Sequence, residues 1–357
     1  MAIYAVDRFA ADDVLAGLAS SSYVFGALVS RLASAAIVDR FGARRLYSGG
    51  AIAATLACSL YLVADTLWLL LIVRFVHGIA FGLAHSSIGA MGQSRIPASR
   101  RGEGNGYFTM AATVGAAVGP LLAVILTRDG AFIPLFIGAA GISLAALVAG
   151  WFIRPIPSDR GAPRTTDQKL GLLAAPAVPI GTVAFLQSLA YASLTAFLAQ
   201  YSQEIDAPAA AGGFFLVYAG CVLVVRTIGG RLYDRFGSDV IMFPGLALYA
   251  GGMVLLALVP SFWAVLAAAA LIGVGYGTLL PTGMAIAAER VGADRPGGAY
   301  ATYFLFVDLG YAVGPMAMGW VLGMAGWSGM FFAGAAAAIL TGALYIAVQR
   351  AHTSRTR

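Results

Sequence analysis

The chain has 357 residues, of which 60% are hydrophobic and only 11% are charged, and its mean hydropathy is +0.84. Soluble domains carry about 25% charged residues, so this composition excludes the water-soluble fold classes. The net charge of +6 is spread over many short loops, a pattern typical of membrane orientation, and we expect no nucleic-acid partner.

Apolar runs recur from end to end of the chain, each near the length of about 20 residues that spans a bilayer. Lipid offers no partner to backbone groups and the runs do not alternate, so they are predicted to be helices. The sequence predicts an all-α polytopic membrane protein with eleven helices, at 14–38, 46–64, 67–91, 104–127, 131–153, 172–199, 209–232, 239–259, 262–286, 299–322 and 327–349.

The connections between these helices alternate in charge. Basic residues gather on one side, at Arg40, Arg44, Arg45, Arg95, Arg100, Arg101, Arg154, Arg160, Arg164, Lys169, Arg231, Arg235, Arg290, Arg295, Arg350, Arg355 and Arg357. Short basic loops stay in the cytoplasm. We therefore predict a multi-pass protein of the cell membrane, with its N-terminus outside and its C-terminus in the cytoplasm.

Sequence motifs for catalysis are missing. The chain has no H-E-x-x-H, no paired carboxylates, no Ser/His/Asp arrangement and no P-loop. Cys58 and Cys221 both lie in apolar runs, where they form no metal or disulfide pattern. We expect no enzyme, no cofactor, no metal and no use of ATP.

An internal repeat runs through the chain. Adding 195 to a position returns the same residue at Gly17, Tyr23, Arg31, Asp39 to Gly42, Gly78, Gly82, Gly115, Gly119 and Pro120. A constant offset over five helices indicates two parallel copies of one unit. We predict a first bundle at 1–154, a cytoplasmic linker at 155–170, a second bundle at 171–350 and a cytoplasmic tail at 351–357.

The same offset leaves the helix at 172–199 without an equivalent, since it maps to positions before residue 5. The second copy thus has six helices and the first has five. We predict that the chain begins just after its own first helix; a protein of eleven helices is the alternative.

A basic turn follows the second helix position of each copy. Asp39, Arg40, Gly42, Arg44 and Arg45 match the pattern G-x-x-x-D-R-x-G-x-R-R, with Ala35 in place of its first glycine, and Gly230, Asp234, Arg235 and Gly237 match it again. In this the chain resembles the major facilitator superfamily. The resemblance implies that the Asp39 carboxylate bridges to a later helix start, near 298–300, and holds one access state. The alternative role of the turn is to hold its arginines on the cytoplasmic side and so to fix the orientation of the chain in the membrane.

Two further motifs carry the resemblance. Arg74 to Gly78 is similar to the superfamily's R-x-x-x-G, and Gly106, Gly115, Gly119 and Pro120 are similar to the G-x8-G-x3-G-P of drug/proton antiporters, without its usual final glycine pair. The resemblance implies two six-helix bundles, with eleven helices in this chain. Such glycines let a second backbone come close and the proline bends the helix, either for gating or for static packing.

Six ionisable residues lie inside the spans, where such residues are functional candidates: Arg31, Arg74, Arg226, Asp308, His77 and His85. Asp308 lies about 15 Å from the start of its helix and Arg31 about 12 Å from Asp39, so they share a depth. The superfamily fold implies that Asp308 faces Arg31. If the Asp308 carboxylate alternates between binding Arg31 and binding a proton, opening of the central cavity is coupled to proton entry. A permanent structural pair is the alternative.

Arg74 shares a helical face with Gly78, Phe81 and His85. In antiporters of the superfamily the matching arginine takes part in proton transfer, and the resemblance implies this role for Arg74. His85 is either a proton relay or an interhelical hydrogen-bond partner. Candidates for the substrate cavity are His85, Gln187, Tyr191, Phe304 and Tyr311, with lipid-facing or packing roles as the alternative.

These features together indicate a secondary active transporter that works by alternating access. We expect proton-coupled efflux of a small, partly hydrophobic molecule by a monomer in the lipid bilayer. The alternatives are a proton-coupled uptake symporter for a sugar or organic anion, which the membrane arginines would attract, and an inactive transporter-derived fragment.

Overall fold

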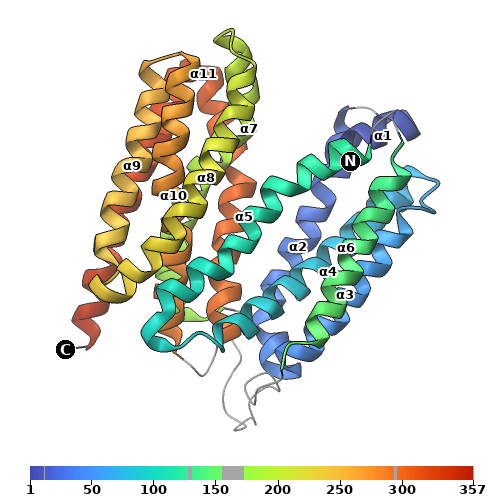
Figure 1. Ribbon diagram of the computed structural model, residues 1–357, viewed down its shortest axis with the longest axis horizontal. Helices are drawn as coiled ribbons and strands as arrows, with labels where there is room; N and C mark the ends of the chain where they lie inside the picture. The colour runs from blue at the N-terminus through green and yellow to red at the C-terminus, as the bar shows by residue number, and fades with distance from the viewer. Residues whose placement is uncertain (12, 128–130, 155–172, 293–295, 357) are drawn as a thin grey trace. The chain divides into compact units, whose positions relative to one another are not determined.

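The computed structural model describes residues 1–11, 13–127, 131–154, 173–292 and 296–356, in which every regular element is a helix (Figure 1). The α-helices are α1 (Ala2–Phe9), α2 (Asp13–Phe41), α3 (Ala43–Leu60), α4 (Leu67–Gln93), α5 (Arg101–Leu126), α6 (Ile133–Trp151), α7 (Val178–Glu204), α8 (Ala209–Phe236), α9 (Asp239–Leu258), α10 (Phe262–Val291) and α11 (Pro296–Thr356). Short 3-10 turns, η1 (Ala98–Arg100) and η4 (Ala175–Ala177), precede α5 and α7. The all-α prediction is confirmed for the described residues.

All eleven predicted helices are present. Two of them, at 299–322 and 327–349, lie within α11 on either side of Gly326, whose φ of 67° and ψ of −171° are not helical. α8 and α10 continue to Phe236 and Val291, beyond the predicted ends at 232 and 286, because the helix does not stop where the apolar run stops. The short α1 was not predicted, since it precedes the first apolar run.

Seven helices among the described residues are long and apolar enough to cross a membrane, with α11 counted once. Large apolar side chains remain exposed on these helices; Leu216 is 77% exposed and Met316 is 78% exposed. Apolar side chains of this kind are stable against hydrocarbon, and the backbone groups in the middle of each helix are already paired within the helix. The helices therefore have the surface of a protein that lies in a bilayer.

The structure repeats its helix starts and turns at the predicted offset of 195 residues. The Thr66 side chain accepts from the backbone N–H of Leu69 at 3.3 Å, and the Ser261 side chain accepts from that of Ala264 at 3.2 Å. Both side chains satisfy an N–H group that the first helical turn leaves unpaired. The same local chemistry therefore begins α4 and α10.

Close contacts between helices recur at the same offset. A Cβ built on Gly50 would lie 3.0 Å from the Ala80 carbonyl, and one built on Gly245 would lie 3.3 Å from the Gly275 carbonyl. These pairs are related by 195 residues, as are the close contacts of Gly78 with Tyr23 and of Gly273 with Tyr218. The repeat read from the sequence is thus a repeat of tertiary contacts.

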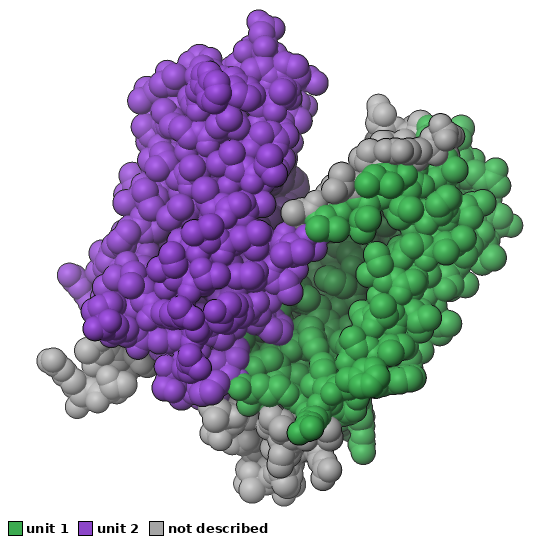
Figure 2. Space-filling model, viewed as in Figure 1, with its two compact units in different colours: residues 1–95, 118–174, 293–302 green, residues 96–117, 175–292, 303–357 purple. Residues whose placement is uncertain are grey.

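The described helices belong to two compact units (Figure 2). The first unit comprises Met1–Arg95, Val118–Ala174 and Ala293–Thr302, and in it α4 packs against α2 and α3 while α6 packs against α3. The second unit comprises Ile96–Ala117, Ala175–Gly292 and Tyr303–Arg357, and in it α10 packs against α7, α8 and α9. The start of α5 thus belongs to the second unit, and the start of α11 belongs to the first.

We expect Gly78→Val to prevent the correct packing of α4 on α2, because Gly78 lies so close to the Tyr23 carbonyl that a Cβ has no room. The obstructing atom is backbone and cannot rotate away. Size-exclusion chromatography of the detergent-solubilised protein is expected to show loss of the monodisperse peak. Gly49→Val is the matched control, since among the described residues nothing lies within 4 Å of a Cβ at Gly49. Equal monodisperse peaks for Gly78→Val and Gly49→Val would contradict the close α2–α4 contact.

Candidate functional site

Asp234 lies near the end of α8, where its carboxylate meets the start of α5 within the second unit. The backbone N–H groups of Gly102 and Glu103 donate to its two oxygens at 2.7 and 2.9 Å. The first turn of a helix has unpaired N–H groups and the positive end of the helix dipole, and therefore favours a carboxylate. We refer to this contact between Asp234 and the first turn of α5 as the carboxylate latch.

A close backbone approach and two ion pairs surround the carboxylate latch. A Cβ built on Gly230, one turn before Asp234, would lie 2.5 Å from the Cα atom of Glu103. Glu103 accepts from Arg100 at 2.9 Å and from Arg231 at 3.1 Å. Both arginines are largely exposed, so these ion pairs contribute little stability. The glycine and the backbone hydrogen bonds therefore determine how closely α5 packs on α8.

The two basic turns have the same conformation. Gly42 and Gly237 have φ values of 85° and 86°, a region that favours glycine because it has no Cβ. The guanidinium groups of Arg40 and Arg235 each lie over the ring of the phenylalanine that follows, at 5.3 and 5.1 Å from the ring centre. The turn geometry is thus a property of the motif and not of one copy.

The trailing arginines of the first turn differ in their environment. Arg44 donates to the backbone carbonyls of Ile153 and Trp151, at the end of α6, where a helix has carbonyls without intrahelical partners. Arg45 is exposed. The side chain of Asp39 lies outside the described residues, so its contact with a later helix stays a prediction.

Three polar side chains form a connected row in the first unit. The Arg31 guanidinium lies 3.1 Å from His85 Nδ1, and His85 Nε2 lies 3.3 Å from the Tyr300 hydroxyl. Arginine only donates, so Nδ1 is the acceptor and the ring proton of a neutral imidazole is on Nε2. His85 thus makes the interhelical hydrogen bonds considered for it, and a relay role stays a prediction.

Arg74 lies in an aromatic part of the first unit. Its guanidinium is 5.5 Å from the centre of the Tyr23 ring, and it interacts with the Tyr61 hydroxyl. His77, one turn along α4, is 2.9 Å from the same Tyr61 hydroxyl through Nδ1. Phe81 lies against Tyr23 and stacks on His85. The face of α4 that the sequence singled out therefore packs against α2.

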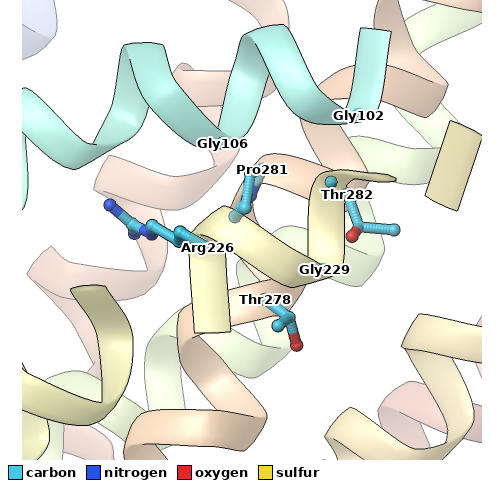
Figure 3. Close-up of a pocket in the computed structure, with 8 residues that line it drawn as sticks. Gly102, Gly106, Arg226, Gly229, Thr278, Pro281 and Thr282 are labelled. Carbon is cyan, nitrogen blue, oxygen red and sulfur yellow. The ribbon is translucent and has the colours of Figure 1, made fainter. Parts of the chain in front are cut away.

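Arg226 connects three helices of the second unit. Its Nε donates to the Gly277 carbonyl of α10 at 3.1 Å, and one terminal nitrogen donates to the Thr109 carbonyl and the Thr113 hydroxyl of α5, each at 2.5 Å. The side chain is only 6% exposed. Beside it, Gly102 and Gly106 of α5 face α8 across a cavity of about 10 Å³ (Figure 3), which has room for about one water molecule.

A cluster of tyrosines lies on α7, α8 and α10 of the second unit. The ring of Tyr191 stacks on Tyr276 at 4.1 Å and on Tyr218 at 5.4 Å, and the Tyr276 hydroxyl is 3.2 Å from Ser188. The sequence pointed to Tyr191 but not to Tyr276 or Tyr218. The repeat could have identified Tyr218 from the sequence, because Tyr218 is the equivalent of Tyr23. Tyr23 contacts Arg74.

The remaining cavity candidates also belong to the second unit. The Tyr311 hydroxyl is 3.3 Å from that of Tyr276, and the Tyr311 side chain is 38% exposed. Gln187 is buried one turn before Tyr191, and Phe304 packs against Tyr303. Asp308 is half-buried in this unit whereas Arg31 is in the first unit, so their pairing stays a prediction.

The antiporter-like glycines have unequal environments. A Cβ built on Gly106 would lie 2.8 Å from the Arg226 carbonyl, whereas among the described residues nothing lies within 4 Å of one at Gly115 or Gly119. Their repeat equivalents are Gly310 and Gly314, which lie against the carbonyls of Phe185 and Leu189 on α7. The side chain of Pro120 lies outside the described residues.

The sequence profile of the Major Facilitator Superfamily matches residues 1–238 and again residues 180–357, and together the two matches cover the chain. The chain belongs to the major facilitator superfamily. An uncharacterized MFS-type transporter of Methanocaldococcus jannaschii is 24% identical over 98% of this chain and 93% of its own length. Another, of Pseudomonas aeruginosa, is 29% identical over 97% of this chain and 87% of its own length.

Solved structures of major facilitator proteins share the fold. The human organic anion transporter MFSD10 (TETRAN) matches with a TM-score of 0.79 and 17% identity, over 96% of this chain and 87% of that chain. FucP in the outward conformation matches with a TM-score of 0.78 and 13% identity, over 96% and 92%. This major facilitator chain is therefore a multi-pass membrane transporter and not an enzyme. The antiporter branch and the missing first helix stay predictions.

Proposed function

We propose that this major facilitator protein is a secondary active transporter that works by alternating access and exchanges protons for a small, partly hydrophobic molecule. The observation that carries the proposal is the hydrogen bond from Arg226 to Thr113. Subtracting 195 from Arg226 gives Arg31, and adding 195 to Thr113 gives Asp308. Since other contacts recur at this offset, the bond in the second unit supports a pair between Arg31 and Asp308.

The two equivalent pairs differ in one chemical respect. The Thr113 hydroxyl does not ionise near neutral pH, so Arg226 keeps a neutral partner. The Asp308 carboxylate is stabilised in its charged form beside a guanidinium, and protonation removes that attraction. Proton binding therefore weakens one of the two pairs and leaves the other unchanged. Such an asymmetry is what coupling of a proton to helix movement requires.

The carboxylate latch supports the alternating-access part of the proposal in the same way. The repeat equivalents of Asp234, Gly102 and Glu103 are Asp39, Gly297 and Gly298. A Cβ built on Gly297 would lie 2.8 Å from Val38, and one built on Gly102 would lie 2.6 Å from the equivalent side chain of Tyr233. We infer that Asp39 accepts from the first N–H groups of α11, and that the two latches form and break as the transporter changes state.

The sequence variation at the latch fits this inference. In the second copy, Gly230 lies against Glu103, a residue with a long side chain. In the first copy, Ala35 replaces the glycine, and Gly298 replaces the glutamate. The glycine is on α8 in the second copy and on α11 in the first copy, so each copy has one glycine at this pair of positions. A close approach of α11 to α2 therefore remains sterically possible despite the departure from the superfamily pattern.

Proton exchange is tested in inverted membrane vesicles made acidic inside and monitored with a fluorescent dye that responds to the internal pH. We expect at least one of three probes, cationic ethidium, neutral chloramphenicol or anionic 1-naphthalenesulfonate, to release protons from vesicles that contain the protein. Vesicles from cells without the protein are the control. Release of protons in both preparations, or in neither, would count against an exporter.

Uptake by proton symport is the second candidate function. It is favoured by the buried cation of Arg226 with its neutral partners, and the related folds include an organic anion transporter and a fucose:proton symporter. Right-side-out vesicles without a gradient distinguish the two functions. Alkalinisation of the medium on addition of a probe would identify the symporter, and no response in either preparation would support an inactive fragment.

A further inference from the structure

Arg226 is a buried cation without a carboxylate partner among the described residues. It lies ten residues before the end of α8, which is about 15 Å along the helix and therefore near the middle of a bilayer of about 30 Å. Its hydrogen bonds go to two carbonyls and one hydroxyl. A charge at this depth is costly unless it is paired or functional. The site therefore lacks a negative charge that a ligand can supply.

The guanidinium also retains donor capacity. Nε and one terminal nitrogen make all its hydrogen bonds, and the second terminal nitrogen donates to none of the residues that the structure describes. The flat fork of an arginine is suited to a carboxylate or sulfonate, which it holds by two parallel bonds. Release of Thr113 would expose a second nitrogen to the same anion.

Aromatic and polar groups surround this donor. Arg226 follows Tyr218 by two turns of α8, and it donates to the carbonyl of Gly277, the residue after Tyr276. The Tyr276 and Tyr311 hydroxyls, 3.3 Å apart, are further donors to an anion. The rings of Tyr191, Tyr218 and Tyr276 already stack on one another, so the ring that can receive an aromatic ligand is that of Tyr311. The exposed ring of Tyr311 is the open edge of the cluster. The Gln187 side-chain oxygen is buried without a hydrogen-bond partner in the described chain, so the same region has an unused acceptor as well.

We propose that the second unit recognises an aromatic organic anion, whose charged group binds Arg226 and whose ring packs on the tyrosine cluster. This proposal rests on the transport function above and specifies its substrate class. Arg226 then has two sets of partners. Thr109 and Thr113 of α5 hold it when the site is empty, and the anion takes the place of Thr113 when the site is filled. Substrate binding thereby loosens one contact between α5 and α8.

The test measures binding to the full chain in detergent, without any gradient. The probes are 1-naphthalenesulfonate and its neutral analogue 1-naphthalenesulfonamide, titrated by calorimetry. We expect the sulfonate to bind at least about tenfold more tightly, as is typical for loss of a charged hydrogen-bonding group. Arg226→Gln is expected to remove this preference, and Arg226→Lys is expected to retain part of it. Thr113→Val is expected to keep or strengthen sulfonate binding, because it removes a competing acceptor.

Equal binding of the two probes by the natural protein would overturn the proposal, whatever the folding of the variants. A preference that survives in Arg226→Gln would overturn it as well. If Arg226→Gln does not elute as a single species, Tyr311→Leu decides the ring contact; it is expected to weaken both probes, and unchanged affinity for both contradicts the tyrosine platform.

Failure here is distinguishable from failure of the proposed function. Proton release by ethidium without sulfonate binding would leave proton exchange standing and contradict the anion site. Sulfonate binding that depends on Arg226, without proton movement in vesicles, would support the anion site and contradict coupled transport.

Discussion

Asp308→Asn is expected to slow proton-driven transport severely while the protein remains folded. Asparagine has nearly the size of aspartate but cannot exchange a proton, so the half-buried position on α11 keeps its packing and loses its titratable group. Coupling free energies between sites usually correspond to about 5–150-fold, and we expect the proton-driven rate to fall on the order of tenfold or more. Dye-monitored proton release in inverted vesicles measures this rate.

The controls for Asp308 separate coupling from general damage. Asp65→Asn removes an exposed carboxylate before α4 and is expected to leave proton release unchanged. Asp308→Glu keeps the ionisable group and is expected to retain part of the rate. Proton release from Asp308→Asn at the natural rate would rule out Asp308 as the coupling group, and would leave the structural role for an Arg31–Asp308 pair.

Removal of the latch carboxylates has the second large expected effect. Asp234→Ala leaves the N–H groups of Gly102 and Glu103 without their acceptor, and an unsatisfied donor costs about 1–3 kcal/mol where it stays buried. We expect amide hydrogen exchange in the first turn of α5 to accelerate on the order of tenfold, which corresponds to about 1.4 kcal/mol. Transport is expected to fall together with the loss of the contact.

The same experiment tests the inferred contact of Asp39 with the start of α11, which we call the first latch. Asp39→Ala is expected to accelerate exchange at residues 297–299 in the start of α11, without an effect on the first turn of α5. Glu204→Ala, an exposed carboxylate at the end of α7, is the control and is expected to change neither segment. Normal expression of Asp39→Ala with natural exchange and natural transport would contradict the first latch.

The helices and the superfamily could be predicted from the sequence because local rules decide them. Each span forms its backbone hydrogen bonds within itself, so a long apolar run is sufficient to specify a helix in lipid. The basic turns are also local, since Gly42 and Gly237 are conformationally required where they stand. Helix ends were less accurate, as in α8 and α10, because a helix can continue through polar residues into water.

The partners of the membrane arginines could not be predicted from one copy alone. Arg226 and Thr113 are 113 residues apart in the chain, and no sequence pattern near either residue indicates the other. The tyrosine cluster was missed for the same reason, since Tyr191, Tyr218 and Tyr276 come from three helices. Their positions follow only from how α7, α8 and α10 pack.

The sequence by itself determined an all-helical membrane transporter of the major facilitator superfamily with an internal repeat, because hydrophobic length and a constant residue offset are written in the order of the residues. Only the tertiary structure decided that the start of α5 packs with the second unit and that Asp234 accepts from its first turn. It also decided that Arg226 binds neutral oxygens. Contacts of this kind depend on which helix faces meet, and close packing between distant helices determines that.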